Sequence, residues 1–493
     1  MRVRLLSRAS HLAVLQAEMV AQALRVQHPQ SEIVRVTRSS EGDRDRRSAL
    51  WAMPEKGVFT ADLSQALAAG EADAAVHSWK DLPVESHPGT LVAGTLERAD
   101  PRDVVLVARD VIASRPATLD VLTSSPRRGW QLEMSLKPLL PWPVETITLA
   151  PVRGNIPTRL GKLIAGEGHA LVVAKAALDR LLSADPSSAI AATLRAAIDQ
   201  CVWMVLPLRE YPTAPAQGAI AVEVPGARPD LRDAVQAITH QPTWDAVVAE
   251  RAILSSFGGG CHDAIGATVL LRDYGRVTSV RARLGDAEPR DHVRWSLEPT
   301  TSGPPPAPAA QIWPRPDERE RASRRPLAVS PPPGTPALWV ARADALPADW
   351  RPGPDQLVWV SGSRTWQKLA ARGVWVHGSA DGLGDAEAPN IDALAGHAIS
   401  WRRLTHTASG DPDALATYVV EQELPADLAA RSHFYWTSGS AFLQAVARYP
   451  ALRSGWHASG PGRTARVLRD TLDAPARISI WLDYDQWHHA VTS

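Results

Sequence analysis

A proline-dense stretch at residues 301–336 is the feature that most restricts how this chain can fold. It holds 11 of the 41 prolines in a chain of 493 residues. Because proline fixes φ and lacks an amide donor, the stretch is expected to be an extended linker rather than part of a core. Seven of the 18 tryptophans precede residue 301, and eleven follow it in a shorter segment. We therefore predict separate domains on the two sides of the linker.

Composition excludes several classes of protein. Lys+Arg and Asp+Glu both total 53, so the chain lacks the cationic excess of a dedicated nucleic-acid-binding protein. Two cysteines exclude a disulfide scaffold and indicate a reducing compartment. No apolar run reaches the ~18 residues of a membrane-spanning helix, and the N-terminus lacks the apolar core of a signal peptide. We expect a cytoplasmic protein, a monomer, with no nucleic-acid or membrane partner.

Strand and helix signals alternate before residue 301. A short apolar strand is expected at Val3–Leu6, and Ser10 then stands at the N-cap of a helix over 11–24. A second strand follows at Ile33–Val36. This β-α-β order predicts an α/β fold with a largely parallel sheet. The same signals predict strands at Ala74–Val76, Val104–Val107 and Leu171–Val173 and a helix at Trp244–Ser256.

The segment AVHSWKDLP at residues 75–83 places polar side chains at the end of a predicted strand. Its candidates are His77, Ser78, Lys80 and Asp81. The carboxyl ends of parallel strands are where α/β sheets bind ligands. Taken alone, the segment is more typical of an exposed turn with an ordinary Lys–Asp pair.

Two arginine-containing segments are candidate anion sites. TSSPRR at 123–128 offers hydroxyls and N–H groups at a helix start, followed by two arginines. RGNIPTR at 153–159 places Arg153 and Arg159 around Gly154 and Asn155. Helix N-termini and guanidinium groups both favour carboxylate or phosphate. Exposed helix starts with surface arginines are the alternative for both segments.

The two cysteines lie in contrasting surroundings. Cys261 follows Gly258–Gly260 after a predicted helix, and so bare a loop favours a reactive thiolate. Cys201 lies in the apolar run CVWMVLP and fits an inert, buried thiol. Gln217, in PAQGAIAVE, precedes an apolar strand and carries little functional weight by itself. No P-loop, zinc-ligand spacing or nucleotide fingerprint accompanies these segments, so no metal is expected.

These segments belong to a series of collinear blocks: SRASHLAVLQA, KGVFTADLSQAL, DAAVHSWKDLP, ERADPRDVV, TSSPRR, RGNIPTRLGKL, PAQGAIAVE, AERAIL and GGCHDAIGA. In this order they resemble the hydroxymethylbilane synthase family, also called porphobilinogen deaminase, over roughly residues 3–270. The resemblance implies a transferase of porphyrin, or heme, biosynthesis. Such an enzyme condenses four porphobilinogen molecules, with loss of ammonia, onto a covalent dipyrromethane cofactor. It then releases the linear tetrapyrrole hydroxymethylbilane by hydrolysis.

The resemblance also implies roles for individual residues. Cys261 would anchor the single dipyrromethane cofactor through a thioether, and Asp81 would protonate the leaving amine and steady the developing cation. Because each pyrrole carries acetate and propionate, the matching basic and polar positions are implied to bind carboxylates. Those implied for the cofactor are Lys80, Thr123, Ser125, Arg127 and Arg128. Those implied for the substrate are Arg8, Ser10, Lys56, Arg153, Arg159 and Gln217. The chain departs from the family pattern at Leu6, Glu55, His262, Asp263 and Ala264.

The implied fold has two lobes like those of periplasmic binding proteins and a small α+β third domain. Lobe 1 would cover 1–100 and 205–225, lobe 2 would cover 101–204, and the cofactor-thiol domain would cover 226–300. The two crossings between the lobes would act as hinges. A non-catalytic two-lobed protein that binds an anionic ligand is the alternative, and it would need no thiol.

Residues 337–493 are expected to form a C-terminal α/β domain. Hydroxyl or glycine residues stand at three strand-to-helix turns, at Ser361–Thr365, Thr437–Ser440 and Gly460–Thr464. Their pattern resembles uroporphyrinogen-III synthase, which closes hydroxymethylbilane into a ring with one pyrrole inverted. Because hydroxymethylbilane cyclises spontaneously to the wrong isomer, a fusion of the two steps is chemically sensible. An appendage that only stabilises or dimerises the enzyme stays equally open.

Overall fold

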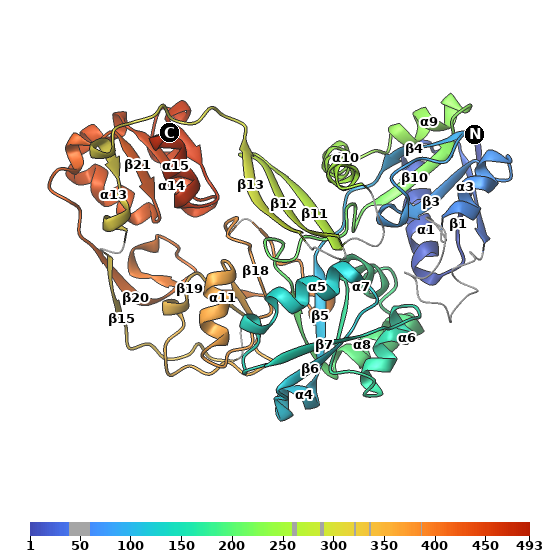
Figure 1. Cartoon of the computed structure of the whole chain (residues 1–493), viewed down its shortest axis with the longest axis horizontal. Coiled ribbons are helices and arrows are strands. Elements are labelled where there is room, and N and C mark those ends of the chain that lie inside the picture. Colours follow the sequence, from blue (N-terminus) through green and yellow to red (C-terminus); the bar gives the residue numbers. More distant parts are fainter. Residues whose placement is uncertain (39–59, 259–263, 286–289, 320–321, 335–336, 386) are drawn as a thin grey trace.

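The computed structural model describes residues 1–38, 60–258, 264–285, 290–319, 322–334, 337–385 and 387–493. Within these ranges the chain forms five β-sheets, and its two ends lie far apart along the long axis (Figure 1). Lys56 and Cys261 lie outside the described residues, as do Glu55, His262 and Asp263. Among the described residues, no helix is both long and apolar enough to cross a membrane.

The first lobe is built on a five-stranded sheet in the order β2-β1-β3-β10-β4. Its strands are β1 (Arg2–Arg8), β2 (Glu32–Arg38), β3 (Ala74–Ser78), β4 (Thr90–Thr95) and β10 (Ile220–Pro225). Its helices are α1 (His11–Gln27), α3 (Ala61–Ala68) and α9 (Pro229–Gln236). Strands β2, β1 and β3 run parallel, whereas β10 runs antiparallel to both of its neighbours.

The second lobe repeats this plan with the strand order β7-β6-β8-β5-β9. Its strands are β5 (Asp103–Ala108), β6 (Thr118–Leu122), β7 (Thr146–Ala150), β8 (Ala170–Ala174) and β9 (Cys201–Val205). Its helices are α4 (Arg109–Ser114), α5 (Pro126–Ser135), α6 (Ile156–Ile164), α7 (Lys175–Ser183) and α8 (Ala189–Ile198). Here β5 is antiparallel to its neighbours β8 and β9. Each lobe thus has the largely parallel sheet that we predicted, with one antiparallel strand, β10 or β5, which enters from the opposite lobe.

A three-stranded antiparallel sheet follows the lobes, in the order β11-β12-β13. Its strands are β11 (Ala264–Arg272), β12 (Gly275–Leu284) and β13 (Arg290–Pro299), preceded by α10 (Gln241–Ser256). Helix α9 does not belong to this unit, because Leu231 and Val235 are buried in the core of lobe 1. The structure therefore places the boundary after α9 rather than at residue 226.

The C-terminal region has two further α/β units. The six-stranded unit has the order β15-β20-β19-β16-β17-β18 and the four-stranded unit has the order β14-β21-β22-β23. The strands of the first are β15 (Ala322–Pro326), β16 (Ala337–Val340), β17 (Val358–Val360), β18 (Gly378–Ser379), β19 (Trp401–His406) and β20 (Leu415–Gln422), with helices α11 (Ser363–Ala370) and α12 (Asp392–Ala395). Those of the second are β14 (Ile312–Trp313), β21 (His433–Trp436), β22 (Trp456–Ser459) and β23 (Ile478–Ile480), with α13 (Gly439–Arg448), α14 (Arg463–Thr471) and α15 (Tyr484–Thr492).

The proline-dense stretch is only partly a linker, which corrects our expectation. Strand β14 pairs with β21, and Ile312 and Trp313 are buried. Strand β15 pairs antiparallel with β20. Both strands lie at sheet edges, where a proline costs no ladder hydrogen bond on the open side. The stretch therefore supplies one edge strand to each C-terminal unit.

Most local predictions agree with the structure. Ser10 caps α1, where its Oγ accepts a hydrogen bond from the Ala13 amide at 3.4 Å. Each predicted strand falls inside an observed one, and α10 contains the predicted helix at Trp244–Ser256. The α/β class with two binding-protein-like lobes is confirmed by the two five-stranded sheets and their helices.

Candidate active site

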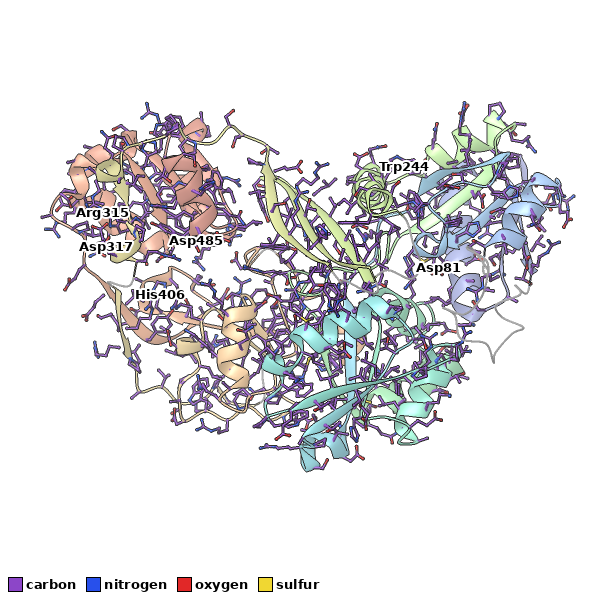
Figure 2. The ribbon with its side chains drawn as sticks, in the orientation of Figure 1. Asp81, Trp244, Arg315, Asp317, His406 and Asp485 are labelled. Atoms are coloured by element: carbon purple, nitrogen blue, oxygen red, sulfur yellow. The ribbon has the colours of Figure 1, made fainter. Side chains whose placement is uncertain are left out.

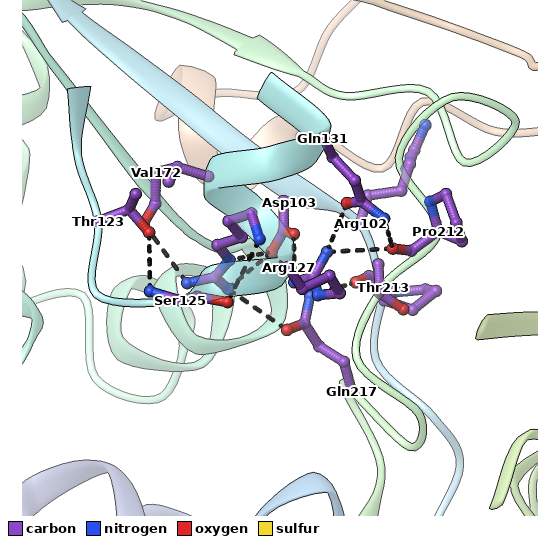
Figure 3. Close-up of polar contacts among 12 residues, drawn as sticks. Arg102, Asp103, Thr123, Ser125, Arg127, Gln131, Val172, Pro212, Thr213 and Gln217 are labelled. Carbon is purple, nitrogen blue, oxygen red and sulfur yellow. Dashed lines mark hydrogen bonds and ion pairs between the residues drawn. The ribbon is translucent and has the colours of Figure 1, made fainter. Parts of the chain in front are cut away.

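A buried carboxylate, Asp103, is the centre of the polar network between the lobes. It begins β5, and its side chain is 1% exposed. Arg127 Nη2 lies 2.9 Å from Asp103 Oδ2, and Arg128 Nη2 lies 2.7 Å from Oδ1. Burial alone would raise the pKa of Asp103, but the guanidinium groups of Arg128 and Arg127 outweigh it and hold this pKa below its ordinary value. Asp103 is therefore ionised and holds both arginines in place (Figure 3).

The same carboxylate is linked to lobe 1. Gln217 lies between β9 and β10, in the second of the two segments that cross between the lobes. Its Nε2 donates to Asp103 Oδ1 at 2.8 Å. Lys80, at the end of β3, donates to Gln217 Oε1 at 3.2 Å. Burial, reinforced by the charge of Arg128, lowers the pKa of Lys80 to about 8. The end of the first-lobe sheet thus meets the second-lobe arginines through a single glutamine.

Three arginines of lobe 2 form a cationic cluster. Burial together with the charges of Arg128 and Arg153 lowers the pKa of Arg159 to about 10. Arg153 has two buried guanidinium nitrogens, Nε and Nη2, without a hydrogen-bond partner in the part of the chain that the structure describes. Buried donors are ordinarily satisfied, so an unsatisfied pair beside like charges indicates a place for an anion.

The local sequence explains why these arginines converge. Ser125 is the N-cap of α5, and its Oγ accepts from the Arg128 amide at 3.4 Å. Thr123 accepts from the Ser125 amide at 3.2 Å, which fixes the turn between β6 and α5. Asn155 caps α6 in the same way, accepting from the Thr158 amide at 3.0 Å. Both helices therefore begin next to the cluster and direct their N-terminal amide dipoles towards it.

Asp81 lies on lobe 1, where its charge acts on Lys80. It ends the short 3₁₀ turn Trp79–Asp81, directly after β3, and is exposed (Figure 2). Trp79 anchors the turn, because its side chain is buried against Trp244 with the ring centroids 5.2 Å apart. A rigid turn thus presents a solvated carboxylate at the end of the strand that also carries Lys80.

The two segments that cross between the lobes contact each other directly. Arg98 forms a buried ion pair with Glu250 at 2.7 Å, and its Nε donates to the Gln217 carbonyl at 2.8 Å. Gly218 has φ +87°, and a Cβ there would lie 2.5 Å from the Ala99 carbonyl oxygen. Only glycine allows this approach. The crossings consequently behave as one connection beside the site.

The predicted site residues differ in their hydrogen-bond partners and in their burial. Gln217, Arg127 and Arg128 donate hydrogen bonds to Asp103, and Lys80 is connected to it only through Gln217. Arg127 is buried and also donates to the Gln131 side chain and the Pro212 carbonyl. Ser10 is occupied as a helix cap, and Arg8 ends β1 on lobe 1.

Sequence reasoning missed Asp103, although it belongs to the quoted block ERADPRDVV. A carboxylate among basic residues in that block was the available signal. Its role depends on arginines about 25 positions further on, which only the fold brings close.

The fold and the site together define a two-lobed α/β enzyme with a cluster of arginines beside the crossings. Residues 3–233 match the family model described as "Porphobilinogen deaminase, dipyromethane cofactor binding domain". The chain belongs to the porphobilinogen deaminase family. This confirms the expected transferase class, the use of porphobilinogen and the dipyrromethane cofactor. The assignments to individual residues, including Cys261, stay predictions.

Two curated relatives agree with this placement. A porphobilinogen deaminase of Ralstonia nicotianae is 35% identical over 300 residues, which are 60% of this chain and 82% of that protein. One from Acidothermus cellulolyticus is 39% identical over 272 residues, 54% of this chain and 74% of that protein. The Methionine Binding Protein MetQ matches at a TM-score of 0.30 and 10% identity, over 52% of this chain and 96% of that one. A likeness at that level decides nothing about function.

Proposed function

We propose that the first 300 residues act as a hydroxymethylbilane synthase that extends a covalent dipyrromethane by four porphobilinogen units. The observation that carries the proposal is the cluster of Arg128, Arg153 and Arg159, with its unsatisfied buried donors. A growing chain of pyrroles with acetate and propionate groups needs guanidinium donors of this kind, and Arg153 has two that are unsatisfied among the described residues.

The residues present fit the cofactor. Arg153 has free donors for a carboxylate, while Arg128 and Lys80 flank the same space from the two lobes. Cys261, outside the described residues, would supply the thioether. When bound, the cofactor supplies the pyrrole end to which each new unit is joined.

The chain's own groups divide the remaining work. The arginines bind and orient the carboxylates of substrate and product. Asp81, an exposed carboxyl group on an anchored turn, donates its proton to the amine of the substrate, which leaves as ammonia when the carbon–nitrogen bond breaks. It also stabilises the cation that develops as the carbon–nitrogen bond breaks. Asp103 takes no direct part in the reaction and holds the side chains of Arg127 and Arg128 in position.

Intact-mass spectrometry of the purified chain tests the proposal against the alternative of a non-catalytic binding protein. The expected result is a mass increase of one dipyrromethane that is absent from Cys261→Ser, together with consumption of porphobilinogen by the wild type. An unmodified chain that consumes no porphobilinogen would favour the binding protein.

We further propose that the C-terminal region is a uroporphyrinogen-III synthase acting on the product of the first site. Its specific support is the setting of His406, an imidazole beside arginines of both C-terminal units. His406 ends β19 and has a buried, unpartnered Nδ1 within the described chain. Burial lowers its pKa, and the charges of Arg463 and Arg324 lower it further. A buried imidazole beside arginines of both α/β units suits a ligand with many carboxylates.

The path of the chain supports this second role. The chain starts in the four-stranded unit at β14, crosses to the six-stranded unit at β15, and returns through β20. The antiparallel pair β15–β20 therefore joins two units that also touch where Gly384, which follows β18, approaches Gly462, the N-cap of α14. Such a double crossing permits the units to close on a ligand.

The isomer of the cyclised product separates this proposal from a purely structural appendage. The full chain is supplied with porphobilinogen, and the oxidised uroporphyrins are resolved chromatographically. A predominance of the type III isomer, reduced by His406→Ala and Arg463→Gln without loss of porphobilinogen consumption, is expected. Only the type I isomer would reject the synthase role.

A further inference from the structure

Lobe 2 and the six-stranded C-terminal unit share a continuous hydrophobic core. Buried side chains of both lie in the same clusters, with Trp366 and Trp375 packed among the residues of lobe 2. The indole of Trp366 donates to the Leu139 carbonyl, and that of Trp375 to the Trp203 carbonyl, each at 3.0 Å. This contact has the density of a domain interior, so the unit is fixed to lobe 2 (Figure 1).

Arg102 lies where this contact meets the first crossing. It is 8% exposed and forms a two-pronged pair with Asp100, at 2.9 and 2.6 Å. Its remaining donors reach the C-terminal unit, to the Pro389 carbonyl at 2.9 Å and the Ser379 carbonyl at 3.4 Å. Its guanidinium carbon lies 5.2 Å from the ring centroid of Trp359.

A second buried cation completes the contact. Lys175 is fully buried and pairs with Asp100 at 3.5 Å and with Asp179 at 2.5 Å. It also donates to the Asn390 carbonyl of the C-terminal unit. Two buried cations are thus balanced by two carboxylates, and the carbonyls of residues 379–390 satisfy the donors that are left.

Arg102 directly precedes Asp103, the centre of the candidate site. Side chains alternate in direction along an extended strand, so the two point to opposite sides of the first strand of lobe 2. Asp103 faces Arg127, Arg128 and Gln217, while Arg102 faces the C-terminal unit (Figure 3). The carbonyls of Ser379 and Pro389 in the C-terminal unit therefore hold Arg102, and with it the adjoining backbone of Asp103.

We propose that Arg102 is a positioning residue through which the C-terminal unit sets Asp103 and, with it, the arginine pair. This inference rests on the function proposed above. The C-terminal region is then a structural partner of the deaminase site, in addition to any chemistry of its own. A shift of about 1 Å in a positioned group costs up to about 100-fold in rate, so a small relaxation of this strand is measurable.

The test compares Arg102→Gln with a matched variant in the full chain. Arg195, on α8, also donates to C-terminal carbonyls, those of Leu394 and Ala393, and its described contacts do not include Asp103. Arg195→Gln therefore loosens the same contact away from the site. Thermal unfolding, cofactor occupancy by intact mass, and kcat and KM for porphobilinogen are measured for both.

We expect Arg102→Gln to lower kcat/KM about 10- to 100-fold. Most of the change should appear as a higher KM, because the arginines bind carboxylates before the transition state is reached. Its cofactor occupancy should also fall. Arg102→Lys, which keeps the charge but has a single donor nitrogen in place of the guanidinium fork, should restore part of both. Arg195→Gln should match the wild type in occupancy and kinetics while losing thermal stability.

Equal kinetic losses in the two Gln variants, or wild-type kinetics and occupancy in Arg102→Gln, would overturn the inference. If Arg102→Gln does not fold, wild-type kinetics in Arg102→Lys with a lowered melting temperature would overturn it instead. A wild-type chain without adduct or turnover would show that the proposed function itself has failed.

Discussion

Replacing Asp103 with Asn tests the electrostatic organisation of the site most directly. The substitution keeps the size of the side chain and removes its charge. The carboxylate accepts from Arg127 Nη2 at 2.9 Å, from Arg128 Nη2 at 2.7 Å and from Gln217 Nε2 at 2.8 Å. An amide keeps one acceptor and turns an NH₂ group towards guanidinium donors, so most of these bonds are lost.

The size of the expected loss of stability follows from the burial of Arg127. Arg127 is 5% exposed and cannot turn to water, so Asp103→Asn leaves a buried cation without its counter-charge. Breaking a buried pair in this way costs about 3–5 kcal/mol. The surrounding Gln131 and Pro212 acceptors hold Arg127 in place and do not replace the charge. Most of that cost should therefore appear as lost stability of lobe 2.

Urea unfolding followed by tryptophan fluorescence measures the loss. Glu133→Gln is the matched control, because Glu133 is an exposed acid on the helix that carries both arginines. Its effect should stay within about 0.5 kcal/mol.

The pH dependence gives a second readout. The folded-state pKa of Asp103 is depressed, so its stabilisation is present above the unfolded value of 3.8 and is lost as pH falls through the folded value. Asp103→Asn should lack this acid-labile part. A loss below about 1 kcal/mol near neutral pH would show that both arginines are solvated and that the reasoning is wrong.

Three further predictions concern single residues. Asp81→Ala should abolish turnover of porphobilinogen while the cofactor adduct persists in the mass spectrum, whereas Glu85→Ala, an exposed acid four positions on, should retain turnover. Because burial lowers the pKa of Lys80 to about 8, Lys80 loses its charge as pH rises through 8. KM for porphobilinogen should then increase above pH 8 in the wild type but stay flat in Lys80→Arg, and a parallel rise in both would exclude Lys80 as the titrating group. Burial raises the pKa of the Cys201 thiol to about 12, so Cys201→Ser should leave turnover and adduct mass unchanged, and a lost adduct would identify it as the anchor.

Much of the site was accessible from sequence because its parts are local. A cap such as Ser10 or Ser125 needs only the amide three residues later, so its role can be inferred from neighbouring positions. Polar residues at the end of β3 were expected at a ligand-binding edge for the same reason. Short apolar runs located β1, β2 and β3 of lobe 1 and β5 and β8 of lobe 2, whereas β4, β6, β7 and β9 were not predicted.

Only the tertiary structure decided which of these residues form ion pairs with one another. Asp103 and the arginine pair lie on different elements, and nothing in their spacing says that one carboxylate holds both guanidinium groups. The C-terminal contact at Arg102 spans more than 270 positions, and the proline-dense stretch became two edge strands because partner strands lay beside it. Local sequence determines the conformation of a segment, whereas the partner of a buried charge is determined by whichever distant segment removes it from water.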